Sequence, residues 1–385
     1  MKVFSWGANS HGQLSQGHTE DLVLPTELLS CPVSASEIAS ITGGGGHSLL
    51  VTKNGHIYSS GSNDRGESCG ETKVKLNFTE IFFSSHRIVQ ATCGWDFSLA
   101  LTDNGQVFTW GSNSFGQLGV SYITKSSCPV EVFIGETDSN LDQQIPSPVT
   151  QVAAGIRHCV VLTENNEVYT WGAGRKGQLG FLDSDKCLSK SEKPVKLTGL
   201  KNPVQVIAGS FHSGVLTDTG GIYIWGCNKY GQSTQLKSKM LPLPTEIPVN
   251  NFPLLTDDFI KELHSGWSHL LVLTKNCQLI SWGRCDYGQL GRPVLQTANG
   301  GNYDPIPQTI KALDKCVCKV FCGAEHNIVI VAGGKLLCWG WNEHGMCGNG
   351  DEINQPTPVP CLIADEFHTL TAGCGTGHSF AIVNV

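Results

Sequence analysis

Short hydrophobic runs recur along the whole chain, and their hydrophobic residues alternate with polar or small ones. SLALT (98–102) and QVFT (106–109) are such runs, and the turn DNG (103–105) separates them. Alternation with a period of two is typical of half-buried β-strands, and Asn-Gly-like turns between such runs indicate hairpins. No stretch shows the sustained period of an amphipathic helix. The pattern therefore predicts an all-β protein assembled from short hairpins.

A Trp-Gly step closes the second strand of almost every predicted hairpin. Successive steps are 50 to 61 residues apart, and Ser60 and Gly61 take the place of one of them. A large aromatic side chain at a fixed repeat position most simply fills the same apolar pocket in each unit. Six of the nine tryptophans occupy this slot, namely Trp6, Trp110, Trp171, Trp225, Trp282 and Trp339.

A second motif, Gly-x-x-His, precedes a short apolar strand six times, and a seventh copy ends in Phe97 instead. A catalytic or metal-binding histidine is not expected once per repeat at a fixed position. We therefore interpret these imidazoles as structural groups that hydrogen-bond the backbone of their turns. The residues are His47, His158, His212, His269, His326 and His378.

The repeats predict one domain over residues 1–385, a seven-bladed β-propeller with four short strands per blade. The strand 379–383 has no hairpin partner after it, and the strand 2–6 has none before it. Pairing these two strands closes the ring and leaves neither edge exposed. The sequence repeats run over residues 1–52, 53–102, 103–163, 164–217, 218–274, 275–331 and 332–385.

Charge and composition restrict the class of partner. The net charge is −7 and no run of lysine and arginine occurs, so binding to nucleic acid through bulk charge is not expected. No apolar run approaches the roughly 18 residues of a membrane span. Because the chain begins inside a predicted strand with no signal peptide, we expect an intracellular protein with mostly reduced cysteines. Alternation along a strand explains the run Cys316, Cys318 and Cys322 better than a metal site.

No catalytic constellation emerges from the chain. There is no Ser-His-Asp order and no pair of carboxylates, and GGGG (43–46) lacks the lysine and the following helix of a phosphate-binding loop. We therefore predict no catalytic residue, no metal and no cofactor.

The two variable positions of Gly-x-x-His are the best candidates for a binding site. They lie on equivalent turns, so they gather on one face of the predicted ring. Tryptophan and arginine are enriched at protein-binding hot spots, and an exposed tryptophan in a turn is hard to explain by packing. The predicted partner-binding residues are Trp95, Asp96, Arg157, Phe211, Trp267 and Glu325.

The Trp-Gly step, the corner NSFGQLG (113–119) and the Gly-x-x-His-Ser element together resemble the regulator of chromosome condensation family of seven-bladed propellers. The resemblance implies a guanine nucleotide exchange factor that binds a small Ras-like GTPase and releases its nucleotide without covalent chemistry. It further implies a role in secretion or vesicle traffic and exocyst-type machinery as a further partner. We expect a monomer in the cytoplasm, and nothing in the sequence excludes passage into the nucleus. The chain as given has no basic N-terminal tail, so we do not expect chromatin binding.

Two other functions remain open at this stage. A propeller can serve as a scaffold for trafficking proteins without exchanging nucleotide, because a fold does not guarantee an activity. Plant members of the resembled family sense ultraviolet light through clustered tryptophans, but only Trp95 and Trp267 occupy the corresponding turns here, in repeats that are not neighbours. Three longer segments, 120–148, 233–258 and 292–307, are candidate functional loops.

Overall fold

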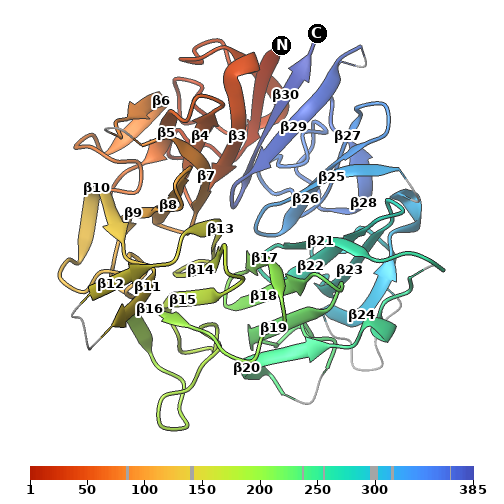
Figure 1. Cartoon of the computed structure of the whole chain (residues 1–385). Coiled ribbons are helices and arrows are strands. Elements are labelled where there is room, and N and C mark those ends of the chain that lie inside the picture. The colour runs from red at the N-terminus through yellow and green to blue at the C-terminus, as the bar shows by residue number, and fades with distance from the viewer. Residues whose placement is uncertain are drawn as a thin grey trace.

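Seven four-stranded antiparallel sheets surround a central channel and follow one another in chain order (Figure 1). They are seen in a computed structural model that describes residues 1–385 except 84–85, 139–142, 236–237, 255, 295–301, 314–315 and 365. The prediction of an all-β seven-bladed propeller is confirmed. We number the blades from the sheet β3–β6 as blade 1, and blade 7 is the sheet that contains both chain ends.

Each blade has the same order of strands from the channel outward. The inner strands are β3 (Ile38–Gly43), β7 (Ile88–Cys93), β13 (Val149–Ala154), β17 (Pro203–Ala208), β21 (Ile260–Ser265), β25 (Val317–Cys322) and β29 (His368–Cys374). The second strands are β4 (His47–Thr52), β8 (Phe97–Thr102), β14 (His158–Thr163), β18 (His212–Thr217), β22 (His269–Thr274), β26 (His326–Val331) and β30 (His378–Asn384).

The other two strands of each blade lie farther from the channel. The third strands are β5 (Ile57–Ser62), β9 (Val107–Ser112), β15 (Val168–Ala173), β19 (Ile222–Cys227), β23 (Leu279–Arg284), β27 (Leu336–Gly340) and β1 (Lys2–Gly7). The outer strands are β6 (Val74–Ile81), β10 (Lys125–Val132), β16 (Lys190–Lys196), β20 (Met240–Ile247), β24 (Tyr303–Thr309), β28 (Gln355–Pro360) and β2 (Leu22–Glu27).

The three long segments are not plain loops, which corrects the expectation from sequence. Segment 120–148 contains the outer strand β10 and an additional hairpin of β11 (Gly135–Asp138) and β12 (Gln143–Pro146). Segment 233–258 contains β20 and the short 3-10 helix Val249–Asn251, while residues 295–301 of the third segment lie outside the described residues. Proline-rich outer strands carry little hydrophobic alternation, so their pattern resembles that of a loop. Two more 3-10 turns occur at Ala35–Glu37 and Lys311–Leu313.

The N-terminal strand closes the ring. Strand β1 pairs with β30 in unbroken antiparallel register from Lys2 opposite Val383 to Gly7 opposite His378. Both chain ends therefore lie side by side in one sheet, as Figure 1 shows. The predicted closure is confirmed, and its reason is that each strand alone would expose an unpaired edge.

The six tryptophans bond each blade to the one before it. All six are fully buried, and their indole Nε1 atoms donate to a corner carbonyl of the preceding blade at 2.8–2.9 Å. Trp171 of blade 3, for example, donates to the carbonyl of Gln117 in blade 2. The predicted inter-unit pocket is confirmed, and a buried donor that would otherwise cost about 1–3 kcal/mol is satisfied in every copy.

The six motif histidines bond each blade to the one after it. Their Nε2 atoms lie 2.7–3.1 Å from a serine hydroxyl or an asparagine carbonyl oxygen of the next blade, as His47 does from Ser98. The interpretation that each imidazole bonds its own turn is therefore wrong. In blade 2, Phe97 replaces histidine, and the matching residue of blade 3 is Cys159, which lies in the same apolar cluster.

The ring at the last position of Gly-x-x-His leaves room only for glycine at the first position. A Cβ on Gly44 would lie 2.4 Å from Cε1 of His47, and a Cβ on Gly94 would meet the Phe97 ring. The ring occupies the space that any larger residue would need. The motif is thus a packing unit in which glycine and ring occur together.

We predict that deleting residues 1–7 unfolds the protein or lowers its melting temperature by more than 10 °C. The deletion removes a whole buried strand and exposes the edges of β30 and β2. The melting temperature is measured by circular dichroism, and deletion of the exposed Val385 is the control that leaves it unchanged. An unaltered melting temperature after the longer deletion would contradict closure by β1.

We also predict that acid weakens the ring through the six histidines. Burial lowers the pKa of His47, His212, His326 and His378 to about 3 and that of His158 and His269 to about 4. Because the unfolded state takes up protons below pH 6.5 and the folded state does not, this stability is present above pH 6.5 and is lost as the pH falls toward 3–4. Each histidine contributes roughly 1.4 kcal/mol per pH unit over that range.

The measurement is the free energy of unfolding in urea between pH 6 and pH 4.5. The double variant His47→Phe with Ser98→Cys copies the pairing of blades 2 and 3. It should take up one proton fewer on unfolding, so its free energy of unfolding should change less steeply with pH. An identical slope in the variant and the wild type would show that His47 does not titrate on unfolding.

Candidate functional site

Two kinds of loop gather on one face of the propeller. The Gly-x-x-His turns join inner to second strands, and the polar corners, such as 113–119, follow the third strands. A second strand runs away from this face and the third strand returns to it, so both loops open on the same side. We call this side, around the opening of the central channel, the mouth face.

The corner of each blade lies beside the turn of the next blade. The guanidinium of Arg157, in the turn of blade 3, lies 4.4 Å from the ring centre of Phe115, in the corner of blade 2. In the same way, Asp286 and Tyr287 of the blade 5 corner lie beside Glu325 of the blade 6 turn. Adjacent blades therefore build seven two-loop sites, and the variable residues of turn and corner meet in each.

The repeated polar residues of the corners are structural. Gln117 accepts a 2.8 Å hydrogen bond from the backbone NH of Phe115, and Asn113 accepts one of 2.9 Å from that of Leu118. The equivalent glutamines of other blades do the same. The corner tips between them are free to vary.

Backbone hydrogen bonds link the turns around the channel opening. The amide of Gly45 donates to Trp95, that of Trp95 to Ile156, that of Trp267 to Ala324 and that of Thr376 to Gly44, over 2.7–3.1 Å. Ser210 reaches the Trp267 carbonyl with both its amide and its hydroxyl. Beneath them the inner strands enclose a cavity of about 280 Å³. The turns therefore form a nearly continuous ring with little freedom to move.

Trp95 and Trp267 meet across this opening. Their ring centres are 5.7 Å apart at an angle of 44°, although they belong to blades 2 and 5. Trp95 is 43% exposed, and its ring packs over Gly45, where a Cβ would come within 2.9 Å of the indole. The repeats are not neighbours, as expected, but the curvature of the ring brings the two side chains together. The result is an aromatic pair at the channel opening, with Trp95 exposed and Trp267 half-buried.

Asp96 follows Trp95 in the same turn and has one carboxylate oxygen without a hydrogen-bond partner in the described part of the chain. Its Oδ1 atom is buried and has no hydrogen-bond partner among the described residues. Burial raises the pKa of Asp96, and the positive charge of Arg157 and a hydrogen bond from Ser112 oppose that rise. A buried carboxylate oxygen without a partner is uncommon and marks Asp96 as a candidate functional residue.

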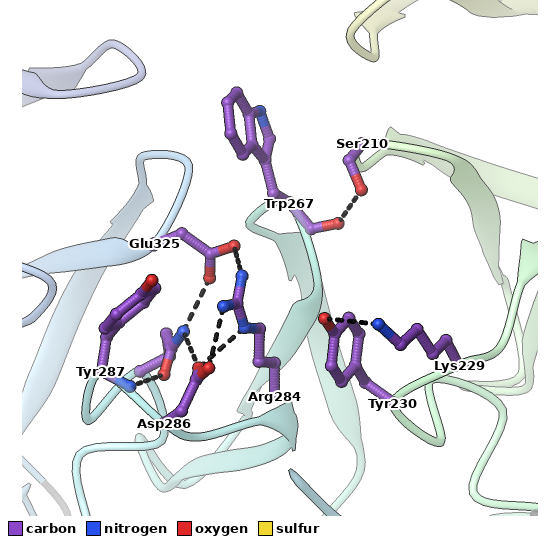
Figure 2. Close-up of polar contacts among 9 residues, drawn as sticks. Ser210, Lys229, Tyr230, Trp267, Arg284, Asp286, Tyr287 and Glu325 are labelled. Carbon is purple, nitrogen blue, oxygen red and sulfur yellow. Dashed lines mark hydrogen bonds and ion pairs between the residues drawn. The ribbon is translucent and has the colours of Figure 1, made fainter. Parts of the chain in front are cut away.

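Glu325, in contrast, is used inside the protein. It is 4% exposed, its Oε1 accepts from Arg284 at 2.9 Å and its Oε2 accepts from Gln289 at 2.8 Å. Figure 2 shows Arg284 between Glu325 and Asp286, with Tyr287 and Tyr230 on its two sides. Burial raises the pKa of Glu325, and its bonds to Gln289 and Arg284 oppose that rise. Its place is beneath the surface, where it positions the corner of blade 5.

The remaining predicted residue, Phe211, is 37% exposed in the turn of blade 4. The structure thus brings Trp95 and Trp267 together at the channel opening, while Asp96 interacts with Arg157 of the next turn and Phe211 lies in the turn of blade 4. Reasoning from sequence missed the corner tips Arg175, Lys176, Lys229 and Tyr230. Their signal was available, because these tip positions vary between repeats just as the turn positions do.

We predict that Arg284→Met lowers the free energy of unfolding by about 3 kcal/mol at pH 7, because the buried Glu325 then loses its ion-pair partner. Urea denaturation measures this loss. Adding Glu325→Gln to Arg284→Met should recover most of it, since the amide needs no counter-ion. A loss that is equally large in the double variant would show that the packing of the Arg284 stem, and not its charge, stabilises this corner.

No helix in the part of the chain that the structure describes is long and apolar enough to cross a membrane. The described residues also include no group of three or more metal-ligating side chains.

A closed ring of seven blades, interlocked by Trp-Gly steps and Gly-x-x-His turns, defines a distinct class of β-propeller. Residues 2–381 match the family model described as the RCC1-like domain. The chain belongs to this family, which confirms the resemblance seen in its motifs.

Named relatives show the same relationship. The chain is 40% identical to the mouse secretion-regulating guanine nucleotide exchange factor, in an alignment covering 99% of this chain and 83% of the mouse protein. It is 31% identical to the ultraviolet-B receptor UVR8 of Arabidopsis thaliana over 92% of this chain and 76% of the receptor. Prp20p of Saccharomyces cerevisiae, whose crystal structure was described with its binding to Gsp1p and histones, has the same fold, with a TM-score of 0.85, 24% identity and coverage of 99% and 91%.

Proposed function

We propose that this protein is a guanine nucleotide exchange factor that binds a small Ras-like GTPase on its mouth face and acts in secretion or vesicle traffic. The observation that carries the proposal is the Trp95–Trp267 pair at the channel opening, with the exposed Trp95 followed in the same turn by Asp96. The name of the mouse relative, which shares 40% of its residues across nearly the whole chain, supports it.

The site suits exchange because exchange needs no covalent step. A protein that binds the nucleotide-free GTPase more tightly than the nucleotide-bound form shifts the GTPase toward release. The aromatic pair provides a rigid anchor that loses little entropy on binding, since the linked turns already hold it. The carboxylate of Asp96, next to the anchor, disfavours a nearby phosphate group by like charge. Together they supply binding energy that the nucleotide-bound form cannot fully use.

We predict that the protein accelerates release of fluorescent GDP from at least one member of a panel of purified small GTPases that includes Gsp1p. In that pair, Trp95→Ala should weaken binding by about 2 kcal/mol, or roughly 30-fold in Kd. Asp96→Ala should slow exchange at least 10-fold and change Kd less than threefold.

Matched controls lie on the opposite face. Phe82 and Asp103 are exposed beyond the far ends of β6 and β8, so Phe82→Ala and Asp103→Ala remove the same kinds of group away from the site. No acceleration of any GTPase at micromolar propeller would overturn the proposed exchange activity. Binding of a GTPase without exchange, unaffected by Asp96→Ala, would favour the scaffold function instead.

We also propose that the protein works in the cytoplasm or the nucleus, in keeping with its family. The names of the relatives give no support to an exocyst-type partner, and the proposal does not include one.

A further inference from the structure

Three neighbouring two-loop sites on the mouth face combine exposed or half-exposed cations with aromatic rings and have no acidic residue at their corner tips. The other corner tips either carry an acidic residue or have no lysine or arginine. We call the three sites the cation–aromatic arc, which consists of Phe115, Arg157, Arg175, Lys176, Phe211, Lys229 and Tyr230. The corresponding corner tips elsewhere are Ser10-His11, Asp64-Arg65, Asp286-Tyr287 and Glu343-His344.

The arc is continuous from blade 2 to blade 5. Arg157 stacks on Phe115 between blades 2 and 3. The corner with Arg175 and Lys176 lies against the Phe211 turn, since a Cβ on Gly226 would meet both the Phe211 carbonyl and Cα of Gln178. Lys229 lies 5.0 Å from the ring centre of Tyr230 at the next site (Figure 2).

Arg157 lies close enough to Asp96 to lower the pKa of that carboxyl, whereas the corner-tip cations Arg175, Lys176 and Lys229 have no such partner among the described residues. None of the four forms an ion pair within 4.0 Å with a described carboxylate. Asp183 and Asp185, the acids nearest in the sequence to Arg175 and Lys176, lie in the loop that leads outward to β16 and form no ion pair with either of them. Arg284, at the end of the arc, is different, because Asp286 and Glu325 already bind it. A patch of three unpaired cations, Arg175, Lys176 and Lys229, on a chain of net charge −7 is a local reversal of sign.

We propose that the cation–aromatic arc receives an acidic surface segment of the GTPase and so sets the orientation in which the partner meets the Trp95–Trp267 pair. This inference rests on the proposed function and adds the charge and position of the partner's contact. Unpaired surface cations attract an acidic partner before contact and accelerate association, whereas the rings beneath them hold the guanidinium and ammonium groups in place.

The test is the double charge reversal Arg175→Glu with Lys176→Glu, at an exposed corner tip whose backbone bonds do not involve these side chains. Its matched control is Lys53→Glu with Lys193→Glu, which changes the charge equally at exposed positions on a hairpin turn and on an outer strand. Association and dissociation with the GTPase identified in the exchange panel are measured by stopped flow at 50 and 500 mM NaCl.

We expect the reversal at the arc to lower the association rate constant at least 10-fold at 50 mM NaCl and less than threefold at 500 mM, with little change in dissociation. The control should stay within twofold. A charge-reversed acidic segment on the GTPase should restore the rate with the Arg175→Glu, Lys176→Glu protein.

Two outcomes would overturn the inference alone. The first is GTPase binding that depends on Trp95 but not on the arc. The second is unchanged GTPase binding with loss of adsorption to phosphatidylserine vesicles, which would assign the arc to an anionic membrane. Failure of every GTPase to bind would overturn the proposed function and this inference together.

Discussion

The fold depends on the bonds that pass from blade to blade. A propeller blade buries only part of its apolar surface within itself, so its stability comes from the contact with its neighbours. Here two buried hydrogen bonds reinforce that contact in nearly every interface, one from an indole to the preceding blade and one between an imidazole and the following blade. Because both groups are fully buried, neither bond competes with water. The β1–β30 pairing then turns a stack of blades into a ring without ends.

The most regularly repeated residues hold the blades together, which explains why they do not form the candidate binding site. The Trp-Gly step and the Gly-x-x-His histidines point between blades and recur in all but one copy each. The two residues inside Gly-x-x-His and the two at each corner tip take no part in these repeated bonds, so their type varies from blade to blade. Variation of these positions on a constant frame produces a surface with local character, such as the aromatic pair at the opening and the cations of blades 3 and 4.

Much of the architecture could be predicted from the sequence because each blade repeats the same local signals. Alternating runs, Asn-Gly turns and the unpaired end strands were sufficient for the blade count and for closure. The role of the histidines could not be predicted from these signals, because the serine that meets His47 is 51 residues away and belongs to another unit. The outer strands were also hard to recognise, since proline and an exposed edge remove the alternation that marks the inner strands.

The candidate binding site was harder to predict from the sequence than the fold. Sequence reasoning could place Trp95 and Trp267 on equivalent turns, but not in contact, because contact depends on the diameter of the channel. Gly45 is part of the reason that contact is possible, since it leaves room for the Trp95 ring where a larger side chain would collide with it. Glu325 shows the converse: its turn position resembles that of Asp96, yet Arg284 and Gln289 of the neighbouring blade bury and bind it. Equivalent positions in a repeat therefore have equivalent backbones but different surroundings. The residues of the adjacent corner determine whether a turn side chain is buried and bonded, as Glu325 is, or exposed to a partner.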